Sequence, residues 1–200
     1  MATHEVSAAA TEHHTSTGLD NTKMGMWAFL GSECLFFGSL ISTYLLYRNE
    51  SGSGPTKEDL YDIPYTSVSS FVLLMSSLTM VLALAAIQRK DERGMRAWLL
   101  ATALLGMVFI GGQIYEFTEF AHEGLSLSAS TFGSSFFVLT GFHGAHVTVG
   151  ILMLMLLVGM SMFGRLGDDA PRKVELIGLY WHFVDIIWII IFTVVYLIPQ

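Results

Sequence analysis

The sequence has few cysteines, charged residues and prolines. Its one cysteine, Cys34, cannot form a disulfide within the chain. Charged residues make up 14% of the 200 residues and hydrophobic residues 52%, which is far too apolar for a soluble domain. The four prolines, Pro55, Pro64, Pro171 and Pro199, lie outside the apolar stretches or at their ends, unlike the Pro-interrupted helices of many transporters. We therefore expect an accessory membrane subunit.

Five apolar stretches are long enough to cross about 30 Å of hydrocarbon as helices, which takes roughly 20 residues each. Their composition predicts an all-α membrane protein, a bundle of five transmembrane helices within residues 24–200. The predicted spans are 24–47, 66–88, 97–117, 131–163 and 174–198.

Basic residues predict the orientation, because Lys and Arg next to short spans stay on the cytoplasmic side. If the helices alternate, eight of the ten basic residues fall on one side, with only Arg48 and Lys57 opposite. The amino terminus is therefore expected inside and the carboxyl terminus outside. The eight residues are Lys23, Arg89, Lys90, Arg93, Arg96, Arg165, Arg172 and Lys173.

Residues 1–23 have neither the basic start nor the apolar core of a cleaved signal, so we expect a mobile polar cytoplasmic tail. Its His4, His13 and His14 have no cysteine or structured partner beside them, and we interpret them as solvated rather than metal-binding. The net charge of −7 is spread over the tail and loops, which gives no indication of nucleic-acid binding.

Glu33 lies ten residues beyond Lys23, about 15 Å deep in the membrane. A carboxyl at that depth costs about 2.5 to 3.5 kcal/mol to insert. Glu33 is therefore either a proton-handling or lipid-cleft residue, or a protonated acid that bonds to another helix. The small residues Gly31, Cys34, Gly38 and Ser42 form a stripe on a different face, where another helix can approach closely.

His182 and Asp185 are three residues apart in the last span, so an imidazole–carboxylate contact within the helix is feasible. His143 and His146 lie in the fourth span, and Glu116 lies near the outer end of the third. No nucleophile accompanies them, and the paired Glu-x-x-His pattern of helical metal sites is absent. We interpret these five residues as a structural polar network, and expect no catalytic or metal site in this chain.

Four motifs appear in the order that one family shows. They are "SECLFFGSL" in the first span, "GQIYEF" in the third, "STFGSSFFVLTGFHGAHVTVG" in the fourth and "YWHFVDIIWIIIFTVVYL" in the fifth. The chain thereby resembles subunit III of haem-copper respiratory oxidases, in the five-helix bacterial form, over nearly all of residues 23–200.

The resemblance implies a multi-pass subunit of the bacterial cytoplasmic membrane that binds no haem or copper. It would pack directly against the catalytic subunit I, which holds those cofactors, in a complex that also contains subunit II. It further implies a V-shaped helix arrangement whose cleft holds structural phospholipids, and a role in proton uptake to which Glu33 corresponds. Headgroup-binding candidates are Lys23, Arg165, Arg172 and Lys173.

Two questions stay open at this point. The "GFHG" motif favours cytochrome c as the electron donor, whereas the short five-helix form and "FTVVYL" also resemble quinol oxidase subunits. Two other classes of function remain: a free-standing proton-conducting protein that uses Glu33 and Asp185, and a membrane enzyme with a metal on His143, His146 and His182.

Overall fold

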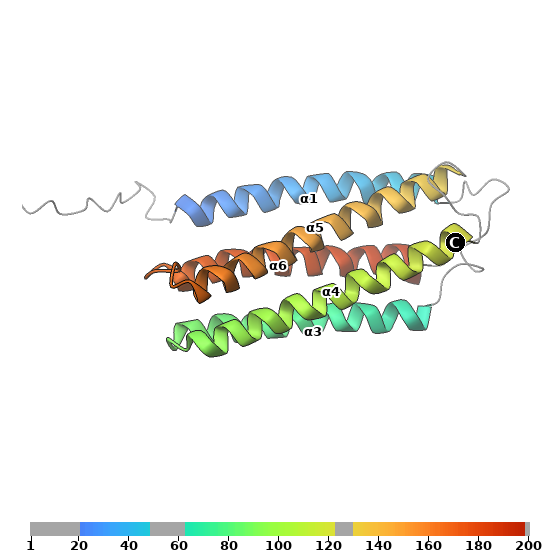
Figure 1. Ribbon diagram of the computed structural model, residues 1–200. Helices are drawn as coiled ribbons and strands as arrows, with labels where there is room; N and C mark the ends of the chain where they lie inside the picture. The colour runs from blue at the N-terminus through green and yellow to red at the C-terminus, as the bar shows by residue number, and fades with distance from the viewer. Residues whose placement is uncertain (1–20, 49–62, 123–129, 199–200) are drawn as a thin grey trace, which may run out of the picture.

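The computed structural model describes residues 21–48, 63–122 and 130–198, which form five long helices side by side (Figure 1). All five are long and apolar enough to cross a membrane, which confirms the predicted all-α class and number of spans. The helices are α1 (Asn21–Tyr47), α3 (Ile63–Gln88), α4 (Glu92–His122), α5 (Thr131–Met162) and α6 (Ala170–Phe192), which continues into the π-helical segment η1 (Thr193–Leu197).

Successive helices alternate in direction, so the start of α1 and both short turns between helices lie at the same end of the bundle (Figure 1, left). The eight basic residues belong to this end, where Lys23 Nζ of α1 lies 2.7 Å from Glu175 Oε1 of α6. The side of the membrane that this end faces stays a prediction.

Short polar contacts set where the helices begin. Lys90 adopts a left-handed conformation (φ 62°) in the α3–α4 turn, and the Asp91 carboxylate accepts a hydrogen bond from the Gly94 N–H at 2.9 Å. Ser130 caps α5 by accepting from the Gly133 N–H at 3.0 Å. Such caps satisfy N–H groups that have no partner in the first helical turn.

Trp181 of α6 occupies the centre of the bundle between α4 and α5. A Cβ added at Gly106 of α4 would lie 2.7 Å from its ring, and one added at Gly150 of α5 would lie 2.8 Å away. The indole N–H donates to Ser76 Oγ of α3 at 2.9 Å. The missing side chains of two glycines therefore let α4 and α5 close on one buried tryptophan, and its polar edge is satisfied.

Trp188, two turns further along α6, repeats this arrangement. Its indole N–H donates to Ser70 Oγ of α3 at 2.8 Å, and its ring meets the Phe109 edge at a centroid distance of 4.7 Å. Buried indole N–H groups usually need such partners, and here α3 supplies a serine for each. The two tryptophans therefore bind α6 to α3.

Helix α1 packs less closely than the others. In its most apolar 18 residues 17% are buried, against 33 to 44% in the other helices. Cβ atoms added at Gly31 and Gly38 would meet no described atom within 4 Å, and Cys34 is exposed. The predicted small-residue stripe thus faces outward, and no helix of the described chain packs on it.

Candidate functional site

Glu33 of α1 pairs with His146 of α5. Glu33 Oε2 lies 3.2 Å from His146 Nε2, and both side chains are mostly buried, with 18% and 19% of their surface exposed. The Phe37 ring meets the imidazole with a centroid distance of 4.9 Å. Glu33 therefore bonds to another helix, and its role in proton handling or in a lipid cleft stays a prediction.

The second ring nitrogen of His146 bonds to its own helix. His146 Nδ1 lies 2.7 Å from the Phe142 carbonyl oxygen, which can only accept, so Nδ1 carries a proton. Nε2 is then the ring nitrogen that faces the Glu33 carboxyl, at 3.2 Å.

His182 of α6 has its partner on another helix, Ser77 of α3. The Ser77 hydroxyl lies 2.7 Å from His182 Nδ1, whereas Asp185, one turn further along α6, has no hydrogen-bond partner for its buried Oδ1 among the described residues. The structure shows no direct hydrogen bond between His182 and Asp185, which corrects the expected contact within the helix. His182 pairs with a residue of a neighbouring helix instead.

Glu116 lies apart from these residues, buried near the carboxyl-terminal end of α4. Thr66 of α3 donates to its Oε1 at 2.8 Å, and Tyr196 of η1 donates to the same oxygen at 3.1 Å. The π-helical segment carries Tyr196, and such segments often accompany functional positions. Glu116 thus joins three helices at one end of the bundle.

His143 is fully buried among aromatic rings. It stacks on Trp188 with a centroid distance of 4.9 Å and meets the edges of Phe37 and Phe109. Neither of its ring nitrogens has a hydrogen-bond partner among the described residues. The five residues predicted as one polar network therefore occupy four separate places, and only His182 and Asp185 share one.

An apolar groove borders the Glu33–His146 pair. It has a volume of about 400 Å³, and its polar walls are His146 and Tyr180. The Tyr180 hydroxyl donates to the His146 carbonyl at 3.0 Å. The remaining lining residues are apolar side chains from α1 and α5: Met26, Phe29, Phe142, Ala145, Val149 and Met153.

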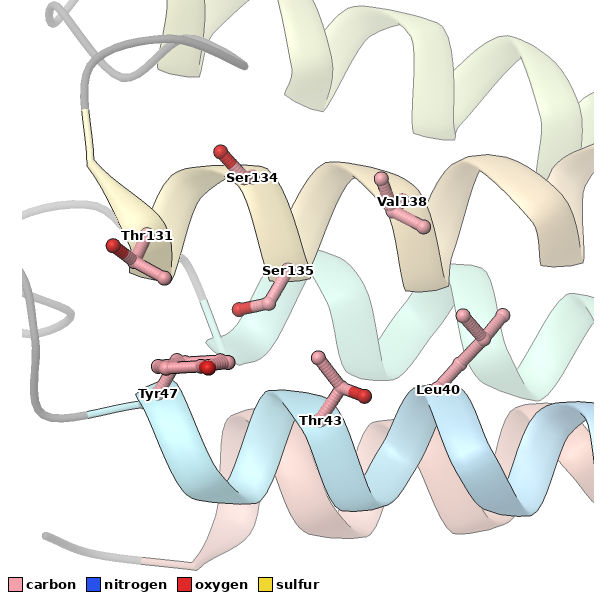
Figure 2. A pocket seen from close by; sticks show the side chains of 7 residues that line it. All are labelled: Leu40, Thr43, Tyr47, Thr131, Ser134, Ser135 and Val138. Atoms are coloured by element: carbon pink, nitrogen blue, oxygen red, sulfur yellow. The ribbon is translucent and has the colours of Figure 1, made fainter.

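A smaller groove of about 190 Å³ lies between the end of α1 and the start of α5 (Figure 2). Ser135 points toward α1, and Tyr47 lies across the end of the groove. The Ser135 and Thr43 hydroxyls donate to carbonyls of their own helices, so the groove wall is effectively apolar. Both grooves suit an apolar chain better than a polar ligand.

The candidate headgroup residues lie at the basic end, where most have partners within the chain. Lys23 pairs with Glu175, and Arg172 lies 3.3 Å from Asp169. Lys173 donates to the Leu166 carbonyl at 2.7 Å. Arg165 is exposed, with its backbone N–H donating to the Met160 carbonyl. These lysines and arginines therefore also stabilise turns and helix ends.

Among the described residues, no group of three or more His, Cys, Asp and Glu side chains is placed to hold a metal ion. The family model of cytochrome c oxidase subunit III matches residues 3–199. The chain belongs to this family. It is thus subunit III of a haem-copper terminal oxidase, a multi-pass protein of the bacterial cytoplasmic membrane, and works beside catalytic subunits.

Similar proteins carry two kinds of name. The chain is 43% identical over 178 residues to a probable quinol oxidase subunit 3 of Staphylococcus saprophyticus, which covers 88% of each chain. It is 41% identical over 196 residues to cytochrome c oxidase subunit 3 of Bacillus sp. strain PS3, covering 98% of this chain and 94% of the relative. A quinol oxidase subunit 3 of Bacillus subtilis is 39% identical over 197 residues, covering 98% and 96%.

Membership of this family favours the accessory-subunit prediction over a free-standing proton conductor or a metal enzyme. Sequence reasoning missed the hydroxyl partners Ser70, Ser76, Ser77, Thr66 and Tyr196. Serine and threonine recur throughout the apolar stretches, so nothing in their spacing distinguished those that face another helix from those that bond to their own backbone.

Proposed function

We propose that the chain is the non-catalytic subunit of a proton-pumping oxidase, where it supports the stability, lipid binding and proton uptake of catalytic subunit I. The family match over residues 3–199 carries this proposal. Haem and copper reside in the partner subunits, which include subunit II. The V-shaped helix arrangement and the inside location of the amino terminus belong to the same proposal.

Cytochrome c is the proposed electron donor. The alignment with the cytochrome c oxidase subunit of Bacillus sp. strain PS3, over 98% of this chain, supports it. Quinol is the second candidate, since the relatives from Staphylococcus saprophyticus and Bacillus subtilis are named as quinol oxidase subunits. Subunit III would not contact the donor in either case, so the donor must be read from its partners.

Structural phospholipids are the proposed ligands of the grooves along α1. Both grooves have nearly continuous apolar walls, as an acyl chain requires, and Met26 of the larger groove lies one helical turn after Lys23. A headgroup near Lys23 would place its chain along Phe29 and toward His146. Arg165, Arg172 and Lys173 are proposed to meet headgroups at the same end of the bundle.

The Glu33–His146 pair is the proposed proton-handling group. Glu33 Oε2 and His146 Nε2 lie 3.2 Å apart at about mid-membrane depth, and His146 lines the larger groove. A proton can shift between the two without creating net charge. His182, Asp185 and Glu116 are proposed to hold helices together.

Purification of the complex through a tag on this chain tests the function. In mild detergent we expect haem absorption bands and a large haem- and copper-binding subunit to accompany it. A partner with a dinuclear copper motif would indicate cytochrome c, and a partner without one would indicate quinol. A colourless preparation that contains only this chain would contradict the proposal.

Lipid analysis of the purified complex tests the groove. Ala145→Trp would fill the larger groove, and we expect it to reduce the number of phospholipids retained per complex. Leu152→Trp is the matched control, since Leu152 lies on the same helix with 64% of its surface exposed and does not line the groove. Equal lipid retention in both variants would refute the groove as a lipid site.

A further inference from the structure

On the outer face of α6, a polar side chain lies beside an apolar stripe. His182 is partly exposed, and Ile186, Ile189 and Ile190 follow it on the same face with 56%, 43% and 42% of their surface exposed. His182 stands near the middle of the apolar segment Ala170–Leu197. An imidazole edge thus reaches the surface of the bundle at the depth where lipid offers no hydrogen bonds.

Only one nitrogen of this imidazole is used inside the chain. His182 Nδ1 lies 2.7 Å from Ser77 Oγ, and within the three described stretches no hydrogen bond reaches His182 Nε2. An unsatisfied polar group in hydrocarbon costs several kcal/mol. The outer nitrogen therefore needs a partner from outside the chain.

The inner contacts determine what kind of partner fits. When His182 Nδ1–H donates to Ser77 Oγ, Nε2 of the neutral imidazole is bare and accepts a hydrogen bond. When Ser77 donates to Nδ1, Nε2 carries the hydrogen and donates. A polar group that can both donate and accept therefore fits.

The exposed face of α1 does not have this need. The exposed hydroxyls of Ser32, Ser39 and Ser42 on α1 donate to carbonyls of their own helix. Glu33 and His146 satisfy each other. Exposed polar groups along α1 are already hydrogen bonded and can therefore face lipid. His182 Nε2 has no such bond within the described residues, so its exposure to lipid would be costly.

We propose that the outer face of α6 around His182 docks on a membrane-spanning helix of the catalytic subunit, which forms a hydrogen bond with His182 Nε2 at mid-membrane depth. Serine, threonine, tyrosine or asparagine on that helix would supply a group that both donates and accepts. The inference rests on the proposed function, because it takes the partner to be the subunit that binds haem and copper. Ile186 and Ile190 would form the apolar part of this contact.

Two conservative variants separate the inner role of His182 from the outer one. His182→Asn places an amide where Nδ1 was and keeps the Ser77 contact, but nothing takes the place of Nε2. His182→Gln places its amide near the position of Nε2 and loses the inner contact. Ser77→Ala is the matched control, because it removes the inner hydrogen bond and leaves Nε2 in place.

The measurement is the rate at which haem separates from the tagged chain when the purified complex is moved into a harsher detergent. We expect His182→Asn to dissociate about threefold to tenfold faster than the wild type, the range for one hydrogen bond between membrane helices. His182→Gln and Ser77→Ala should stay within about twofold. Dissociation of His182→Asn at the wild-type rate, or equal acceleration in all three variants, would overturn the proposal.

A photo-crosslinker tests the same surface without relying on stability. Placed at Ile186, it should crosslink to the catalytic subunit, and placed at Leu152 on exposed α5 it should not. Crosslinks from Ile186 to lipid alone would overturn the inference. A wild-type preparation without haem would instead contradict the proposed function, so the two failures are distinguishable.

Discussion

Helices α1 and α6 belong to one bundle, but they are held in it by different means. The α6 segment has 44% of its most apolar stretch buried. Trp181 packs on glycines of α4 and α5, and both Trp181 and Trp188 donate to serines of α3. Helix α1 has 17% of that stretch buried and contacts its neighbours through polar pairs and a few aromatic rings. The looser packing along α1 leaves grooves for ligands.

The largest effect should come from a glycine-to-alanine substitution where α5 packs on α6, compared with the same substitution on α1. Gly150→Ala places a Cβ 2.8 Å from the Trp181 ring and should lower the stability of the subunit by about 1 to 3 kcal/mol through overpacking. Gly38→Ala meets no described atom and should leave stability unchanged or raise it by up to about 1 kcal/mol, since alanine favours helices. Thermal dissociation of the complex measures both. Equal losses would mean that a partner packs α1 as tightly as α6.

Next in size is the loss of an indole hydrogen bond. Trp188→Phe should cost about 1 to 2 kcal/mol, because Ser70 loses its donor and the stacked His143 loses part of its ring contact. Trp27→Phe on α1 is the control and should change stability by less than about 0.5 kcal/mol, because 61% of Trp27 is exposed. Denaturation in increasing SDS, followed by fluorescence, compares them. Equal costs would contradict the difference between the helices.

A moderate effect is expected where α1 meets α5. Glu33→Leu removes the partner of His146 Nε2 and should cost about 1 kcal/mol, comparable to one hydrogen bond between membrane helices. Glu33→Gln should cost less than half of that, because its amide can still donate to the ring. The same SDS titration applies. If Glu33→Leu is as stable as the wild type, the pair does not hold α1.

The smallest effect concerns the exposed ion pair at the basic end. Lys23 and Glu175 are 40% and 38% exposed, so their coupling should be about 0.2 to 1 kcal/mol. It should fall as salt screens the charges. A double-mutant cycle of Lys23→Ala and Glu175→Ala at low and high salt measures the coupling. A salt-independent value above this range would show that a buried contact is involved.

Hydrophobic length alone was sufficient to locate all five helices, since a membrane span requires a long uninterrupted apolar run. It gave their ends less well: α4 begins at Glu92 and ends at His122, beyond the predicted 97–117. Polar ends of a helix can extend into water, and apolar length does not report on them. The candidate site was predicted only in part, because Glu33 and His146 were both identified but their pairing across 113 positions was not.

The sequence by itself determined the class of the protein, the number of helices, the end that carries the basic residues and the family. These follow from composition, from the cost of placing charge in hydrocarbon, and from motifs that are local in the chain. The tertiary structure decided which polar groups meet: Glu33 with His146, Ser77 with His182, and Glu116 with Thr66 and Tyr196. The physical reason is that the rotation of each helix about its axis depends on close packing around Trp181 and Trp188, and no single span contains that information.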